Sequence, residues 1–334
     1  MALATAAIAV ASHSCNTEKT DGSAAVADNH GYDVVAYVWD GDEALPRPEH
    51  VTGINYAFAV LNDTHDKLVI NNEERFRKVI DLKQQKPELK IMLSLGGSGA
   101  TGFSEMAADS LKRRSIAGDC ARIIRQYGID GIDVDWEFPG DENGTPEDLP
   151  NFVLLIKDIR DSIGTDRILS VAPGMNMPDV INMVDYLNIM AYDLGPQAPY
   201  HHTTLYRSEH TGWHSVDELI QHCFAQGVPP EKILLGLGFY GRGDGVNFKE
   251  WTSYKDIVVT DRQTVEWDSV ACVPYVADLD GNLVIGYDSP RSLEIKCDYI
   301  KEKGLRGAMY WRAELDADFR PLARKVAESL LPGK

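Results

Sequence analysis

The sequence predicts a (β/α)8 TIM barrel, and three patterns in its 334 residues support this. Short apolar segments, typical of buried parallel strands, alternate with amphipathic stretches of helical period. Eight such apolar segments can be counted, which is the number that closes a parallel barrel. One of them carries a row of acidic residues toward its carboxyl end, where barrels of this kind place their reactive groups.

The predicted strands are the segments in which apolar and β-branched residues dominate. They are Val34–Trp39, Val51–Val60, Lys90–Leu95, Ile129–Trp136, Ile168–Ala172, Tyr186–Tyr192, Ile233–Phe239 and Arg306–Trp311. Helical periodicity predicts helices over Glu73–Gln85, Lys112–Tyr127, Glu147–Ile163, Val216–Gln226, Arg291–Lys303 and Phe319–Leu331. The connections after the first and fifth strands are short or irregular.

Residues 32–334 are expected to form one domain, with an insertion between the seventh and eighth strands at about residues 243–288. This stretch is too long for a plain loop. Within it, Val273–Val276 and Leu283–Tyr287 flank an Asp280-Gly281 turn, which predicts a β-hairpin. We therefore expect a small α+β insertion that forms one wall of a cleft.

The composition, 44% hydrophobic and 25% charged, is typical of a soluble globular protein. The net charge of −18 disfavours binding to nucleic acid and to anionic lipid. It suits a neutral or cationic substrate, although charge alone does not name one. We expect a monomer without a nucleic-acid partner.

Residues 1–15 form a short apolar run that ends in small residues and Cys15. This resembles the end of a bacterial secretion signal with a lipidated cysteine, although a basic start is lacking. The run is too short to span a membrane. Residues 16–31 are small and polar, as in a flexible tether. We expect an exported protein, in the periplasm, on the cell surface as a lipoprotein or outside the cell; a leader remnant is the alternative.

The remaining cysteines are scattered, and we expect small buried hydrophobic residues rather than a disulfide framework: Cys120, Cys223, Cys272 and Cys297. Four histidines crowd one segment, namely His201, His202, His210 and His214. No acid or cysteine at ligand spacing supports a zinc site there, so a polar loop is the simpler interpretation.

The most informative segment runs from Asp130 to Gly140 and places four acids within eight residues. In a strand, Asp133, Asp135 and Glu137 would share one face. Crowded carboxylates push their pKa values apart, so that one can stay protonated near neutral pH. A general acid that cleaves a glycosidic bond needs such a group. An acidic edge strand or a divalent-cation site are alternatives, but the apolar neighbours and the lack of further oxygen ligands disfavour them.

The segment from Asp130 to Glu137 resembles the DGxDxDxE signature of glycoside hydrolase family 18, the chitinases. Ser94-Leu95-Gly96-Gly97 is similar to that family's SxGG motif, and Met190-Ala191-Tyr192-Asp193 to its MxYD motif. Gly238–Arg242 and Gly307–Trp311 resemble the ends of its seventh and eighth strands. These matches follow the family order from about Val34 to Leu331.

The resemblance implies hydrolysis of β-1,4-linked N-acetylglucosamine polymers by a substrate-assisted retaining mechanism, without cofactor or metal. Glu137 would be the acid and then the base, and Asp135 would bind the acetamido N–H. Asp133 would tune Asp135, and Tyr192 would hold the acetamido carbonyl. Further candidates for sugar contact are Trp311, Tyr37, Phe58, Met190, Asp193, Tyr240 and Arg242. Structural roles are expected for Asp130, Ser94, Gly96 and Gly97.

Three rival functions remain at this stage. An endo-β-N-acetylglucosaminidase acting on N-glycan cores would share the acid pair. A non-catalytic chitinase-like lectin usually lacks the acid, whereas Glu137, Asp135 and Tyr192 are all present here. A phosphate-binding barrel would need a glycine-rich loop after the seventh strand, which is not found.

Overall fold

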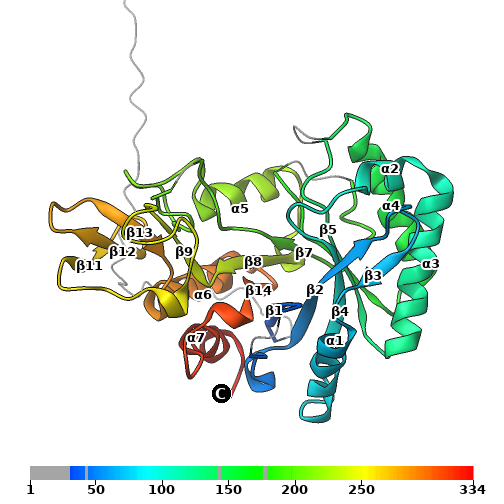
Figure 1. Cartoon of the computed structure of the whole chain (residues 1–334), viewed down its shortest axis with the longest axis horizontal. Helices are drawn as coiled ribbons and strands as arrows, with labels where there is room; N and C mark the ends of the chain where they lie inside the picture. Colours follow the sequence, from blue (N-terminus) through cyan, green and yellow to red (C-terminus); the bar gives the residue numbers. More distant parts are fainter. Residues whose placement is uncertain (1–30, 42–43, 141–143, 176–178, 197, 334) are drawn as a thin grey trace, which may run out of the picture.

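Eight parallel strands close into a barrel, as the sequence predicts (Figure 1). Their order around the barrel is β1-β14-β8-β7-β6-β5-β4-β2, and pairing of β1 with β2 completes the ring. The strands are β1 Asp33–Trp39, β2 Gly53–Leu61, β4 Lys90–Gly96, β5 Gly131–Asp135, β6 Ile168–Val171, β7 Tyr186–Ile189, β8 Ile233–Gly238 and β14 Gly307–Trp311. A short strand, β3 Leu68–Ile70, pairs antiparallel with β2.

The computed structural model describes residues 31–41, 44–140, 144–175, 179–196 and 198–333. The leader segment with Cys15 and nearly all of the predicted tether therefore lie outside the described residues. Within the described ranges, no helix combines the length and the apolar character that crossing a membrane requires.

The helices occupy the outside of the barrel near their predicted positions. They are α1 Glu73–Ile80, α2 Phe103–Ala108, α3 Ser110–Tyr127, α4 Asp148–Ile163, α5 Val216–Ala225, α6 Pro290–Lys303 and α7 Pro321–Leu330. The helix predicted over Glu73–Gln85 changes to a 3-10 turn at Asp81. The short helix α2 is missing from the prediction, because six residues give too little helical periodicity.

Four strands end earlier than predicted, and two of these ends bear on the site; β6 and β8 stop one residue early, at Val171 and Gly238. β5 ends at Asp135, so Glu137 lies just beyond the strand, and β7 ends at Ile189 rather than at Tyr192. Asp193 then adopts a left-handed backbone with φ of 57°. In both segments the residues before the motif are apolar. The sequence therefore does not reveal where the strand ends and the chain turns toward the barrel mouth.

The predicted insertion is an antiparallel sheet with the order β10-β9-β13-β12-β11. Its strands are β9 Tyr240–Gly243, β10 Thr252–Ser253, β11 Gln263–Asp268, β12 Val273–Asp278 and β13 Leu283–Tyr287. The β12–β13 hairpin confirms the prediction from the Asp280-Gly281 turn. The sheet projects to one side of the barrel (Figure 1), and α6 follows it as the helical part.

A buried ion pair joins the insertion to the barrel. The Lys296 ammonium of α6 contacts both carboxylate oxygens of Asp288 at 2.8 and 2.6 Å. It also donates to the Thr203 hydroxyl, 2.6 Å away, in the connection that follows β7. All three residues are at most 1% exposed, so removal of one partner would leave a buried charge uncompensated. The end of β13, helix α6 and the connection after β7 are therefore held together at this ion pair.

The thiols only partly follow the prediction. Cys120, Cys223 and Cys297 are free and buried, as expected. Cys272 is disulfide-bonded, so the expectation of a free thiol is wrong there. A single buried cysteine without a nearby partner in sequence carries no signal of a bond, because connectivity cannot be deduced from spacing in a chain of this size.

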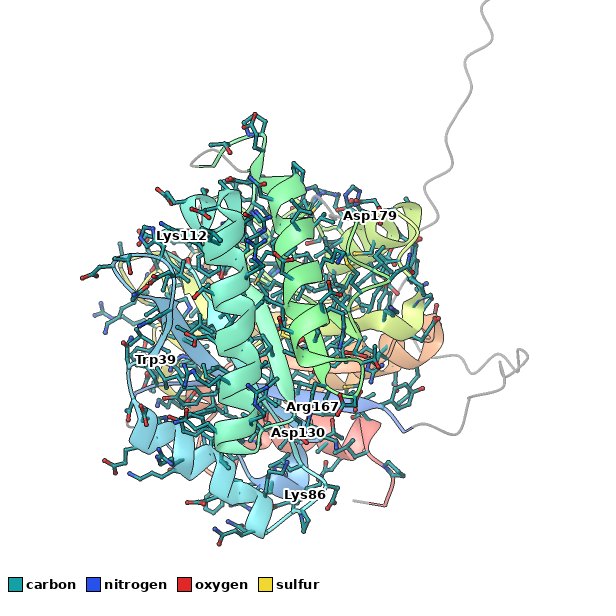
Figure 2. The ribbon with its side chains drawn as sticks, turned by 90° about the vertical axis from the view of Figure 1, so that its right-hand side faces the viewer. Trp39, Lys86, Lys112, Asp130, Arg167 and Asp179 are labelled. Atoms are coloured by element: carbon teal, nitrogen blue, oxygen red, sulfur yellow. The ribbon has the colours of Figure 1, made fainter. Side chains whose placement is uncertain are left out.

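Asp130 lies at the end of the barrel away from the acidic row. Figure 2 shows it near the lower end of α3, whereas Lys112 marks the upper end where α3 begins. The Asp130 carboxylate accepts bonds from the Lys83 ammonium at 2.6 Å and from the Ile91 amide at 2.9 Å. These contacts join the start of β5 to β4 and to the segment after α1.

Candidate active site

Asp133 is the most deeply fixed member of the acidic row. Its carboxylate is fully buried and accepts four side-chain hydrogen bonds. The donors are Tyr37 at 2.8 Å, Ser94 at 2.7 Å, Ser170 at 2.6 Å and Asn188 at 2.9 Å. Burial raises the pKa of Asp133 against these bonds, which favour the carboxylate. With two donors on each oxygen, Asp133 is held as an acceptor.

Asp135 stands one pleat further toward the mouth. It is 4% exposed, and its Oδ1 has no hydrogen-bond partner among the described residues. Burial, together with the charges of Glu137 and Asp133, raises the pKa of Asp135 well above its ordinary value. A buried carboxyl oxygen without a partner costs free energy, unless it holds a proton or meets a ligand. Asp135 therefore has an unused atom that a polar ligand group could satisfy.

Two glycines at the carboxyl end of β4, Gly96 within the strand and Gly97 just after it, allow close packing. Gly96 and Gly97 have φ angles of 114° and 90°, a region that residues with a side chain rarely adopt. A Cβ on Gly96 would lie 2.2 Å from the Asp135 carbonyl oxygen, and one on Gly97 would lie 2.4 Å from the Phe58 ring. The Gly97 amide donates to that same carbonyl at 2.8 Å. The SxGG segment thus packs its backbone closely against the backbone of Asp135.

Glu137 follows β5 at the barrel mouth and is only partly buried. Burial, and then the charge of Asp193, raise the pKa of Glu137 to about 7. A carboxyl group with this pKa is half protonated at neutral pH, which suits an acid that must later act as a base.

The Asp193 carboxylate is paired with a cation. The Arg242 guanidinium grips its carboxylate with two bonds of 2.6 and 2.5 Å, in a bidentate pair. The His202 Nδ1 atom lies 3.5 Å from Asp193 Oδ1. Although burial alone would raise it, the bonds from His202 and Arg242 lower the pKa of Asp193. Asp193 therefore stays ionised and remains beside Glu137 as a fixed negative charge.

Three aromatic residues form the opposite side of the mouth. The rings of Phe58 and Trp311 stack with centroids 5.7 Å apart at 21°, and Tyr37 lies 5.7 Å from Trp311. Trp311 ends β14 and stays partly exposed, as a sugar platform requires. Tyr37, by contrast, is 2% exposed and bound to Asp133, so its observed contact is with the acid row. Its contact with sugar remains a prediction.

Tyr192 and Tyr240 meet edge to face on the insertion side, with ring centroids 6.1 Å apart. The Tyr192 hydroxyl is 4.0 Å from the Met309 sulfur. Burial and the nearby Asp135 raise the pKa of Tyr192 well above its usual range, so it remains a neutral donor. Tyr240 is only 1% exposed and supports Tyr192 from behind, while its predicted sugar contact stays untested.

The crowded histidines lie in an irregular connection after β7, as predicted, but two of the four are buried. His201 and His202 are fully buried between the barrel and the insertion. His201 lies 3.2 Å from Asp268 of β11. Among the residues that the structure describes, no group of three or more histidine, cysteine or acidic side chains could hold a metal ion.

Sequence reasoning missed two partners of Asp133, Ser170 and Asn188. Ser170 stands directly beside Asp133 in the β5–β6 register, just as Ser94 does on the β4 side. The signal was a single polar residue inside each of two apolar strands, where a side chain facing the interior needs a partner.

Comparison with known proteins now places the chain. The model described as "Glycosyl hydrolases family 18" matches residues 28–316, which is most of the sequence. The chain belongs to glycoside hydrolase family 18. The closed parallel barrel described above is the fold expected of this family.

Several family members resemble the chain over most of its length. An endochitinase of Manduca sexta is 28% identical over 84% of this chain and 61% of its own. Chitinase A1 of Niallia circulans is 29% identical over 88% of this chain and 49% of its own. The chain thus spans about half to three fifths of these two relatives.

Among solved structures, a family 18 N-acetylglucosaminidase from Paenibacillus barengoltzii has a TM-score of 0.79 and 29% identity. It covers 90% of this chain and 100% of its own. Chitinase ChiW from a Paenibacillus species has a TM-score of 0.80 and 28% identity, over 90% of this chain and 43% of its own.

Proposed function

We propose that this family 18 protein hydrolyses β-1,4-linked N-acetylglucosamine polymers, that is, chitin and its oligosaccharides. The observation that carries the proposal is the arrangement of Asp135 and Glu137 above Asp133. One carboxyl has an unused buried oxygen, and the next has a pKa of about 7. Chitinases among the relatives support the same substrate class.

The mechanism that fits this arrangement uses the substrate as nucleophile. A two-carboxylate mechanism needs a second free acid across the anomeric carbon from the first. Asp193, whose charge acts on Glu137, is held in a bidentate pair by Arg242. Family 18 is a known exception to the two-carboxylate scheme, because the acetamido oxygen of the substrate attacks instead.

In this mechanism the protonated Glu137 gives its proton to the glycosidic oxygen. The leaving sugar departs as the acetamido oxygen bonds to the anomeric carbon. Asp135 accepts the acetamido N–H with its unpartnered oxygen, and Tyr192 donates to the acetamido oxygen as it becomes oriented for attack. Glu137, now a carboxylate, takes a proton from the water that opens the oxazolinium-type intermediate. Both displacements occur at the anomeric carbon and each inverts it, so the overall configuration is retained.

The test combines substrate choice with product stereochemistry. N-acetylglucosamine oligomers should be cleaved, with the β-anomer as first product in NMR of fresh hydrolysate. Cellulose oligomers and fully deacetylated chitosan should resist cleavage, because they lack the internal nucleophile. An initial α product, or turnover of the unacetylated chains, would refute this mechanism.

Two narrower alternatives share the same acid pair. An exo-acting N-acetylglucosaminidase, like the Paenibacillus barengoltzii relative, would release single sugars from chain ends. An N-glycan endo-enzyme would cleave a glycoprotein core and leave chitohexaose intact. A product profile on chitohexaose beside a high-mannose glycoprotein separates all three.

A further inference from the structure

His202 is a buried polar side chain close to Asp193, and the proposed mechanism leaves it unused. It lies in the connection between β7 and α5 and is fully buried. Its ring packs on the Tyr240 ring, with centroids 4.8 Å apart, and meets the Tyr200 ring edge to face at 6.5 Å. A Cβ on Gly238 would lie 3.0 Å from His202 Cε1, so the end of β8 passes directly against the ring. Packing on several sides therefore fixes the orientation of the imidazole.

The two ring nitrogens of His202 contact different segments. Nε2 lies 3.0 Å from the Tyr240 carbonyl oxygen. Because a carbonyl can only accept a hydrogen bond, Nε2 carries a hydrogen and donates it. Nδ1 faces Asp193 instead, at 3.4 Å from the amide nitrogen and 3.5 Å from carboxylate Oδ1. His202 therefore connects the first residue of β9 to the last residue of the MxYD motif.

The backbone at Asp193 needs support from outside its own segment. The pairing of β7 with β8 ends at Ile189, four residues earlier. The left-handed φ of 57° is a conformation that costs free energy in a residue with a side chain. The Asp193 amide donates to His202 Nδ1, and the next amide, of Leu194, donates to the His202 carbonyl at 3.2 Å. His202 thus holds two consecutive amides of this bend.

The pair with Arg242 does not by itself fix where the Asp193 carboxylate lies. The guanidinium binds both carboxylate oxygens, but it ends a long side chain that is 26% exposed. Such a side chain has many rotamers, so the ion pair can shift as a unit. The His202 ring cannot shift without displacing the Tyr240 ring that packs on it. Of these two partners, His202 is therefore the one that sets the position of Asp193.

Asp193 is the charged group that the surroundings of His202 and of Glu137 share. Besides Asp193, the titratable and charged side chains around His202 in the described part of the chain are His201, Tyr200, Tyr240 and the Arg242 partner of Asp193. Those around Glu137 are Asp135 and Tyr192. After burial, the charge of Asp193 is what raises the pKa of Glu137 to about 7. Because the Coulomb energy falls with distance, a displaced Asp193 would raise this pKa less.

The preceding residue provides a matched comparison. His201 is as buried as His202, but its Nε2 lies 3.2 Å from Asp268 of β11. Its ring meets the Tyr275 ring of β12 at 5.4 Å. His201 therefore faces β11 and β12 of the insertion, whereas His202 faces Asp193.

We propose that His202 is a positioning residue, which holds the Asp193 carboxylate in the place from which it acts on Glu137. The inference rests on the proposed function, because it takes Glu137 as the acid of that reaction. His202 needs no contact with the substrate for this role. Its effect passes through Asp193, and Asp193 sets the protonation of Glu137 near neutral pH.

The test is the titration of Glu137 in the full chain, followed by NMR of isotopically labelled glutamate carboxyl groups. The Glu137 signal is identified as the one that Glu137→Gln removes. His202→Phe keeps a flat ring without nitrogen, and His202→Ala leaves the site open. In both, the titration midpoint of Glu137 should fall by about one pH unit, the lower end of what a neighbouring charge produces. His202→Asn places a polar atom where Nδ1 stood and should restore the wild-type midpoint.

Two controls separate positioning from a general loss of stability. His201→Phe, the same change at the neighbouring buried histidine, should lower Tm and leave the Glu137 midpoint in place. In an Asp193→Asn background, His202→Phe should cause no further shift, because the charge through which it acts is gone. The fall of kcat/KM on chitohexaose at alkaline pH should follow the midpoint in every variant.

Three outcomes would overturn the inference. They are an unchanged or raised midpoint in His202→Phe and His202→Ala, a shift in His202→Asn as large as in these two, and a further shift beside Asp193→Asn. A wild-type protein that leaves chitohexaose uncleaved would instead contradict the proposed function, and the NMR titration would still decide the role of His202.

Discussion

Replacing Glu137 by glutamine should abolish turnover and, at alkaline pH, stabilise the protein. The amide keeps the shape of the side chain but cannot titrate. We expect kcat to fall by roughly 10²–10⁴, the usual contribution of general acid–base catalysis. Binding of chitin oligosaccharides should survive, because the platform and Asp135 remain.

The stability effect follows from the raised pKa. In the folded protein the pKa of Glu137 is about 7, above its usual 4.5. Its protonated form therefore supports the fold fully below pH 4.5, and that support is lost as the pH rises through 7. Each tenfold change in acid strength is worth about 1.4 kcal/mol, so at pH 8 the glutamine variant should gain about 2–3 kcal/mol after discounting for partial exposure.

The assay is thermal or urea unfolding of both proteins at pH 5 and at pH 8. For a domain of this size the gain corresponds to roughly 3–5 °C in Tm at pH 8. The variant should gain little at pH 5, where wild-type Glu137 is protonated. Glu105→Gln, on the exposed surface of α2, should behave alike at both pH values. A variant with normal turnover, or one whose gain does not depend on pH, would refute the reasoning.

Two further outcomes are expected. Asp193→Asn removes the charge that raises the pKa of Glu137, so the fall of kcat/KM above about pH 7 should move to lower pH; an unchanged or upward-shifted profile would contradict this. Trp311→Ala should weaken oligosaccharide binding while Tm stays near the wild-type value; a loss of about 3–5 kcal/mol of stability with normal affinity would show a core residue instead.

The barrel could be predicted because the eight strands are apolar runs and most of them are followed by a helix. The acid row was equally readable, since the two-residue period of a strand fixes which side chains share a face. Ser170 and Asn188 could not be assigned in the same way. Their contacts with Asp133 depend on how neighbouring strands are staggered, and the stagger is a property of the closed ring.

How deeply each aromatic residue is buried could not be predicted from the sequence either. Tyr37 and Trp311 both lie in carboxyl-terminal halves of strands, yet one is buried against an acid and the other reaches the mouth.

The buried Lys296–Asp288–Thr203 junction limits how the cleft can work. It fixes the insertion to the barrel through a buried ion pair, and separating that pair would cost free energy. This wall of the cleft is therefore expected to stay in place. If the proposed function holds, a polymer chain would enter and leave without a movement of this wall. Turnover should accordingly depend on how fast the chain slides or dissociates within a standing groove, and tethering the insertion to the barrel with an engineered cross-link should leave it unchanged.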